Sequence, residues 1–331
     1  MLMNKRWFLA LLWIAALPSF GDAPPRNWGR CPAVVSLETT EVVHALGDTH
    51  GDYDHLIKLL VAGKLIAGAP DKPEQVTWSG GRSIFVVTGD MIDKWDHSLK
   101  VIALMRALTT SAASQGGRVV ISTGNHEAEF LQNPHGDKTK EFQKELKAAG
   151  IKRNDVADGT DSEGIGKFLL CLPFATRVND WFFAHAGSTK GRTFLQLATD
   201  LQQEFDEHRY AATVLLGNKG LLEARMKPPW WQKESDTPIE SMARLLCYAD
   251  ALGVHHIVFG HQPGTYTFND DTTRKKGTMF EKFGGLVFLI DVGMSRGVDY
   301  SKGALLRIER EGDRERAVVV WADGREEELW P

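Results

Sequence analysis

Apolar runs of strand length recur along this chain, and helical patterns separate the early ones. Helix spacing follows Asp52 and Asp54, and it recurs over residues 98–108. Strand–helix–strand order favours parallel βαβ units, so we predict an α/β fold. The last two runs predict a hairpin, with its turn at residues 311–313. The expected strands are EVVHAL, SIFVVT, RVVIST, WFFAHA, HIVFG, LVFLID, ALLRIE and AVVVW.

Two long stretches lack strand patterns, namely residues 135–167 and 192–252. The first is charged and contains glycines, and the second includes the helical runs TFLQLATDLQQEF and IESMARLLCYADAL. We interpret both as helical insertions within one domain that covers residues 34–331. A segment containing proline and glycine, residues 22–33, would serve as a linker before that domain.

The first 21 residues have the pattern of a secretory signal peptide. Lys5 and Arg6 precede an apolar run that ends at a proline, and small residues, Ser19 and Gly21, lie where a signal peptidase cuts. The apolar run is shorter than the roughly 20 residues of a membrane span. We therefore expect export to the periplasm or medium with no stable membrane span after cleavage, and an uncleaved anchor is the alternative.

The three cysteines are Cys31, Cys171 and Cys247. An odd number leaves at least one thiol unpaired unless it bonds another chain. Cys171 and Cys247 have apolar neighbours in the sequence, so we expect both to be small buried core residues.

The composition is that of an ordinary soluble globular protein, with 43% apolar and 25% charged residues. The net charge of −4 includes no basic excess. This argues against a nucleic-acid partner, and nothing in the composition indicates an oligomeric state.

Polar residues follow five of the expected strands directly. Ligands of open α/β sheets bind beyond the carboxyl ends of the strands, so these side chains should meet at one face. Any one of them alone is typical of a turn or of a satisfied side chain, but the full series favours a metal centre. Carboxylate, imidazole and amide oxygen suit divalent manganese, iron or zinc. The residues are Asp48, His50, Asp90, Asp93, Asn125, His126, His185 and His261.

The turns that follow these strands, called corners below, resemble the motif series of calcineurin-like metallophosphoesterases. The matching stretches are GDTHG, GDMID, GNHE, AHAG and GHQ, and GNHE resembles the phosphoprotein phosphatase branch. HGDYDHLIKLL and LIDVGMSRG are similar to segments of Shewanella-like protein phosphatases. The resemblance implies a four-layer αββα sandwich with helical cap insertions.

The resemblance also implies two divalent or trivalent metal ions bridged by Asp90, with manganese, iron or zinc expected. A water or hydroxide held between the ions would attack phosphorus. His126 would protonate the leaving oxygen, and Asp93 would orient His126. Lys94 and Asn125 would contact the substrate phosphate. The implied ligands are Asp48, His50 and Asp90 for the first ion, and Asp90, Asn125, His185 and His261 for the second.

Two departures from the family pattern concern phosphate binding. Lys94 stands where the family has an arginine, and lysine cannot form a bidentate fork with phosphate. The subgroup also has an arginine after a tryptophan in the insertion, where PPWWQKE offers Gln232 and Lys233. Trp230 and Trp231 would either pack in the cap or line the substrate site.

The sequence therefore favours a metal-dependent phosphomonoesterase acting on phosphoprotein, at phosphotyrosine or phosphoserine/threonine. A hydrolase of nucleotides or other small phosphoesters is an alternative, although such relatives usually show GNHD. A catalytically weak phosphate-binding relative is the remaining alternative, because of the missing arginine.

Overall fold

The computed structural model describes residues 25–312 and 314–331. The predicted signal peptide, the first residues of the predicted linker and Asp313 in the predicted hairpin turn lie outside these ranges. Within them, no helix has both the length and the apolar character needed to cross a membrane.

One six-stranded sheet joins the first three predicted strands to the C-terminal hairpin. Its order is β14-β13-β12-β2-β3-β4, with β2, β3 and β4 parallel and the others antiparallel. The predicted hairpin is confirmed as β12 and β13. The bounds are β2 Val43–Leu46, β3 Ile84–Val87, β4 Arg118–Ile121, β12 Ala304–Glu311, β13 Arg314–Trp321 and β14 Glu326–Trp330.

A second six-stranded sheet has the order β1-β5-β6-β7-β11-β10. Strands β6, β7 and β11 run parallel, so their carboxyl ends share one edge. A separate small hairpin is formed by β8 and β9. The bounds are β1 Val34–Leu37, β5 Ala175–Val178, β6 Trp181–Ala184, β7 His256–Phe259, β8 Tyr266–Thr267, β9 Thr273–Arg274, β10 Phe280–Lys282 and β11 Val287–Leu289.

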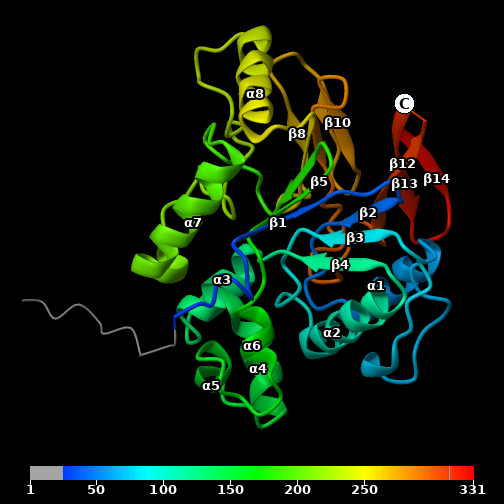
Figure 1. Cartoon of the computed structure of the whole chain (residues 1–331), viewed down its shortest axis with the longest axis vertical. Coiled ribbons are helices and arrows are strands. Elements are labelled where there is room, and N and C mark those ends of the chain that lie inside the picture. Colours follow the sequence, from blue (N-terminus) through cyan, green and yellow to red (C-terminus); the bar gives the residue numbers. More distant parts are fainter. Residues whose placement is uncertain (1–24, 313) are drawn as a thin grey trace, which may run out of the picture.

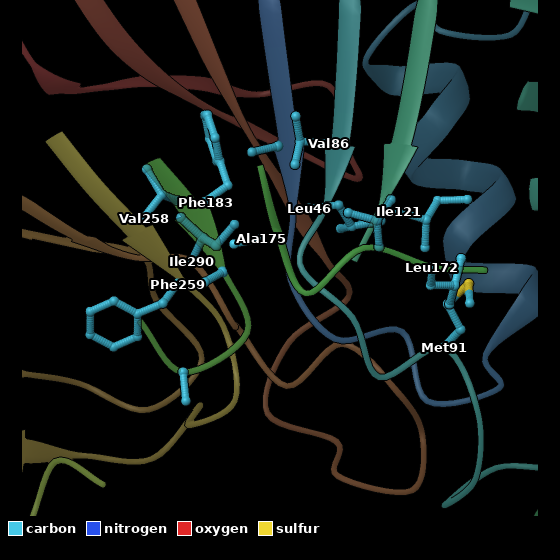
Figure 2. Packing of buried hydrophobic residues seen from close by; sticks show 14 of the residues in the cluster. Leu46, Val86, Met91, Ile121, Leu172, Ala175, Phe183, Val258, Phe259 and Ile290 are labelled. Carbon is cyan, nitrogen blue, oxygen red and sulfur yellow. The ribbon is translucent and has the colours of Figure 1, made fainter. Parts of the chain in front are cut away.

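Apolar side chains of both sheets belong to one buried cluster (Figure 2). Val86 and Ile121 come from β3 and β4, and Phe183 and Val258 come from β6 and β7. All four side chains are buried. Burial on both faces explains why strands such as β3 and β6 are continuous apolar runs without alternation.

The helices lie around the two sheets (Figure 1). α1 and α2 lie beside the first sheet, α3 to α6 form a group, and α7 and α8 lie nearer the second sheet. α4 and α5 fall within the first predicted insertion, α6 extends just past its end, and α7 and α8 fall within the second. The bounds are α1 Tyr53–Ala62, α2 Ser98–Ser114, α3 Asn125–Gln132, α4 Lys140–Ala148, α5 Arg153–Ala157, α6 Ile165–Leu169, α7 Phe194–His208 and α8 Pro238–Leu252.

Polar side chains cap the N-termini of α1, α7 and α8, three of the helices that the sequence predicts. The Asp52 carboxylate accepts from a backbone N–H of α1. Thr193 and Thr237 begin α7 and α8 with capping boxes. Such caps satisfy N–H groups that have no partner inside the helix. The mixed α/β architecture with two packed sheets confirms the predicted fold class.

The prediction for two of the cysteines is wrong. Cys171 forms a disulfide with Cys31, and Cys247 is exposed. Cys247 lies on the outer side of α8, whereas Leu245 and Ala249 on the same helix are buried. Apolar neighbours in a helical sequence do not determine which way a single side chain points.

Candidate active site

The predicted site residues follow the carboxyl ends of strands from both sheets. Asp48 comes after β2, Asp90 after β3 and Asn125 after β4. His185 and His261 follow β6 and β7 of the other sheet. Because the strands of each set are parallel, their ends meet at one edge, and the two edges lie together. This arrangement brings distant corners of the sequence into one site.

Several of these residues have a left-handed backbone, which is unusual outside glycine. The angle φ is 41° at His50, 51° at Asp90, 69° at Asp93, 61° at Lys94 and 69° at His261. Such conformations cost on the order of 1 kcal/mol each and persist only where the surroundings enforce them. The loops of the site are therefore held in shape by contacts elsewhere.

One buried side chain that the sequence analysis left without a role provides such contacts. The Glu127 carboxylate accepts backbone N–H groups from Asp90 at 2.9 Å, Met91 at 2.7 Å, Ile92 at 3.1 Å and Gly124 at 2.8 Å. Glu127 is fully buried. It therefore ties the loop that carries Asp90 to the start of α3.

Four potential metal-binding atoms converge, and Nε2 of His185 is one of them. This nitrogen lies 3.0 Å from Asn125 Oδ1, 3.1 Å from His261 Nδ1 and 3.4 Å from Asp90 Oδ2. These atoms are mostly hydrogen-bond acceptors. The group therefore has too few N–H or O–H hydrogens to link all of them by hydrogen bonds. The donor set therefore fits a cation, and Asp90, His185 and His261 form a group that could hold one.

A second group of ligand atoms shares Asp90. His50 Nε2 lies 3.6 Å from Asp90 Oδ2 and 3.7 Å from Asp48 Oδ2. The other ring nitrogen of His50 contacts the carbonyl of Ile92 at 3.1 Å. That contact turns Nε2 toward the carboxylates. His50, Asp90 and His126 form the other group that could hold a metal ion.

Burial and neighbouring charges shift the pKa values of these groups. Burial lowers the pKa of His50 to about 3, and burial together with His185 lowers the pKa of His261 well below its usual value. Both imidazoles are therefore neutral, which is the form that binds metals. Burial and the charges of Asp291 and Asp90 raise the pKa of Asp48 well above its usual value.

Burial also works against the ionised form of Asp90. The imidazoles of His185 and His126 outweigh that effect and hold the pKa of Asp90 well below its usual value. Asp90 is therefore ionised in the folded protein. An ionised carboxylate between two groups of ligands is the chemical requirement for a bridging ligand.

His126 and Asp93 form a pair beside these groups. His126 Nδ1 lies 3.2 Å from Asp93 Oδ2. Asp93 Oδ1 accepts backbone N–H groups of Glu141 at 2.9 Å and Phe142 at 3.3 Å, which fix the carboxylate. Burial disfavours the charged imidazole, but Asp90 and Asp93 raise the pKa of His126 above its usual value. His126 can therefore carry a proton near neutral pH.

A cavity of about 450 Å³ opens over these residues. Cationic side chains line it together with the acids and imidazoles, so it suits an anionic ligand. The lining residues are His50, Asp90, Asp93, Lys94, Asn125, His126, Lys138, Arg225 and His261.

A sequence model of the calcineurin-like phosphoesterases matches residues 42–265. The chain belongs to the calcineurin-like phosphoesterase family. It is therefore a hydrolase of phosphoesters.

Among curated relatives, an uncharacterised Schizosaccharomyces pombe protein is 26% identical over 86% of this chain and 82% of its own length. Shewanella-like protein phosphatase 2 of Arabidopsis thaliana is 35% identical over 101 residues, which are 30% of this chain and 24% of the relative. The crystal structure of a cold-active protein-tyrosine phosphatase from a psychrophilic Shewanella matches with a TM-score of 0.68 and 22% identity, covering 93% of this chain and 87% of that one. The predicted family and subgroup resemblance are confirmed.

The structure of this phosphoesterase brings all the predicted site residues together. Lys94 lines the cavity with Asn125, His126 and Asp93. The predicted metal ligands lie close to one another, at the distances given above. They are Asp48, His50, Asp90, Asn125, His185 and His261. Their individual roles as ligands, acid and phosphate contacts stay predictions.

The second departure concerned Gln232 and Lys233, which PPWWQKE offers in place of the family arginine. Within the described ranges, Arg225 lines the cavity and those two residues do not. Trp230 and Trp231 are buried in the core, which confirms the packing alternative. Arg225 lies before the two tryptophans in the sequence.

A further acid that the sequence analysis did not assign lies beside Asp48. Asp291 follows β11 within the LIDVGMSRG stretch and is buried. Its Oδ1 accepts the N–H of Gly293 at 2.8 Å. The backbone of Asp291 also approaches Gly47 so closely that a Cβ at Gly47 would lie 2.9 Å from the Asp291 Cα. The LIDVGMSRG stretch and the GDTHG corner therefore pack directly against each other.

Proposed function

We propose that this phosphoesterase is a metal-dependent phosphomonoesterase that acts on phosphoproteins and uses two metal ions. The observation that carries the proposal is the position of Asp90. One of its oxygens faces both His50 and His185, which belong to the two separate groups able to hold an ion. Asp48 and His50 would complete the first site, and Asn125, His185 and His261 the second.

When bound, the two ions would lower the pKa of water and stabilise the charge on the attacking and leaving oxygens. The residues fit manganese, iron or zinc, because the set combines carboxylate, amide and imidazole without a thiolate. Asp90 would neutralise part of the positive charge of both ions.

His126 would donate a proton to the leaving oxygen of the substrate. Its pairing with Asp93 at 3.2 Å supports this role, because the carboxylate orients the ring and favours its charged form. The backbone N–H groups that bind Asp93 fix its position, and the pair with His126 is therefore held at the cavity.

Lys94 and Arg225 would bind the phosphate oxygens, and Asn125 lines the same cavity. Both cations line the cavity over Asp90. Arg225 can form two parallel hydrogen bonds with a phosphate, whereas Lys94 supplies a single charge. An arginine at this cavity weakens the case for a catalytically inactive relative.

Two observations support a phosphoprotein substrate over a nucleotide or another small phosphoester. The third corner reads GNHE, which resembles the phosphoprotein phosphatase branch. The similar proteins described above include ones named as protein phosphatases. Small phosphoesters remain the second candidate, since any phosphomonoester fits the same metal and cation set.

Two assays test the proposal in sequence. The first is hydrolysis of p-nitrophenyl phosphate with added manganese, with Asp90→Asn as the inactive control. The second compares kcat/KM for phosphotyrosine, phosphoserine and phosphothreonine peptides with kcat/KM for mononucleotides and dinucleoside polyphosphates. A kcat/KM that is higher for a phosphopeptide than for any of the nucleotides supports the proposal. No hydrolysis of the aryl phosphate, or a preference for nucleotides, would overturn it.

We also propose that the protein is exported after cleavage of residues 1–21. The Cys31–Cys171 disulfide supports this, because such bonds persist mainly in oxidising compartments. The mass of the protein recovered from a periplasmic or medium fraction tests it. An intact N-terminus on protein confined to the cytoplasm would contradict export.

A further inference from the structure

The amide of Asn125 has a fixed orientation. Its oxygen Oδ1 lies 3.0 Å from His185 Nε2 and therefore faces the converging ligand atoms. Its nitrogen Nδ2 points the other way and donates to Glu129 Oε1 at 3.3 Å. Only the oxygen of an amide can bind a metal ion, so the orientation decides whether Asn125 can act as a ligand.

Glu129 is well placed to control that orientation. It lies one helical turn after Asn125 on α3, where side chains four residues apart are neighbours. Its side chain is only 14% exposed. Lys138 donates to the same Oε1 and lies 3.5 Å from Glu223 Oε1. Lys138 of the first insertion therefore pairs with Glu129 and lies beside Glu223 of the second insertion.

We propose that Glu129 is a positioning residue that keeps the Asn125 oxygen directed at the second metal ion. This inference rests on the two-ion site of the proposed function. If the amide rotated, its oxygen would face the Glu129 carboxylate and its NH₂ group would face the ion. Both contacts would be repulsive, so Glu129 makes one of the two amide orientations strongly preferred.

A simpler explanation is that Glu129 serves only as the ion-pair partner of Lys138. The two explanations differ in what each substitution removes. Glu129→Met removes the acceptor for Asn125 Nδ2, whereas Glu129→Gln keeps an oxygen there. Lys138→Met breaks the ion pair and leaves the acceptor in place.

The experiment measures manganese binding to the full chain by calorimetry, after removal of metal with a chelator. Glu129→Met should weaken binding of the second ion by roughly 10- to 100-fold, as loss of a partner that orients a metal ligand usually does. The manganese affinity of Glu129→Gln and that of Lys138→Met should each stay much closer to the affinity of the parent. Equal weakening by Lys138→Met and Glu129→Met would overturn the proposal in favour of the ion pair.

A double-mutant cycle with Asn125→Asp makes the test specific to orientation. A carboxylate presents an oxygen in either orientation, so Glu129→Met should no longer weaken binding in that background by more than about twofold. Full weakening there would overturn the proposal. Circular dichroism checks folding, and Glu129→Ala replaces Glu129→Met if the methionine variant does not fold.

The outcome for the parent protein separates this inference from the proposed function. A parent that binds two manganese ions and hydrolyses aryl phosphate, with an unaffected Glu129→Met variant, would overturn the role of Glu129 alone. A parent that binds fewer than two ions would overturn both the two-ion site and the role of Glu129.

Discussion

Replacing Glu127 with glutamine should destabilise the fold strongly, although the two side chains have almost the same shape. Each carboxylate oxygen of Glu127 accepts two backbone N–H groups, Oε1 from Met91 and Ile92, and Oε2 from Asp90 and Gly124. Glutamine presents NH₂ in place of one oxygen. Two buried N–H groups then lose their acceptor, at roughly 1–3 kcal/mol each, so we expect a loss of about 2–6 kcal/mol in the free energy of unfolding.

Urea unfolding followed by circular dichroism measures this loss, and EDTA in all samples removes any contribution from bound metal. Glu38→Gln makes the same chemical change at an exposed side chain and is the control. Surface substitutions of this kind stay within about 0.5 kcal/mol of the parent. If Glu127→Gln is no less stable than the control, Glu127 does not hold the loop that carries Asp90, and the account of the left-handed residues there is wrong.

Substitutions at four further residues test individual roles. Asp90→Asn should lower the metal content after desalting well below that of the parent, because both sites lose a shared negative charge; unchanged occupancy would rule out the bridge. His126→Asn should slow hydrolysis of esters with poor leaving groups by about 10²- to 10⁴-fold and that of aryl phosphates much less, and equal losses would argue against an acid. Asp93→Asn removes a charge that raises the pKa of His126, so the alkaline limb of the kcat/KM profile should move to lower pH; an unmoved limb would contradict the pairing. Lys94→Arg should lower the inhibition constant of inorganic phosphate by about fivefold, the equivalent of roughly 1 kcal/mol, and Lys94→Ala should raise it; if neither shifts, Lys94 does not contact phosphate.

The sequence was sufficient to predict the strands that carry the site. Strands that lead to the site, such as β3 with IFVV and β6 with WFFA, are short apolar runs, because both faces of their sheets are buried. Two of the strands that the sequence analysis missed, β1 and β14, are different. β1 is partly exposed and β14 is mostly charged, with the sequence EEELW. Pairing with a neighbouring strand makes these segments extended, and that pairing leaves little local pattern.

The disulfide and Arg225 were missed for a related reason. Cys31 and Cys171 are separated by 140 residues, and the pairing of β1 with β5 brings their segments together. Arg225 lies in a loop between α7 and α8, where neither periodicity nor a strand end marks it. Both features depend on contacts between segments that are distant in sequence.

The first turns of α3 show most clearly what a motif can and cannot predict. Successive residues of a helix point about 100° apart, so neighbours in the GNHE motif must contact different parts of the protein. Asn125 faces the imidazole of His185, His126 faces Asp93, Glu127 binds the loop after β3, and Glu129 contacts a lysine of the first insertion. The sequence identified Asn125 and His126 because their chemistry fits a metal centre. Glu127 and Glu129 were missed because their partners, backbone N–H groups and the far side of an amide, are defined only when the chain is folded. Substitutions at these two glutamates therefore test the folded arrangement itself, independently of the motif.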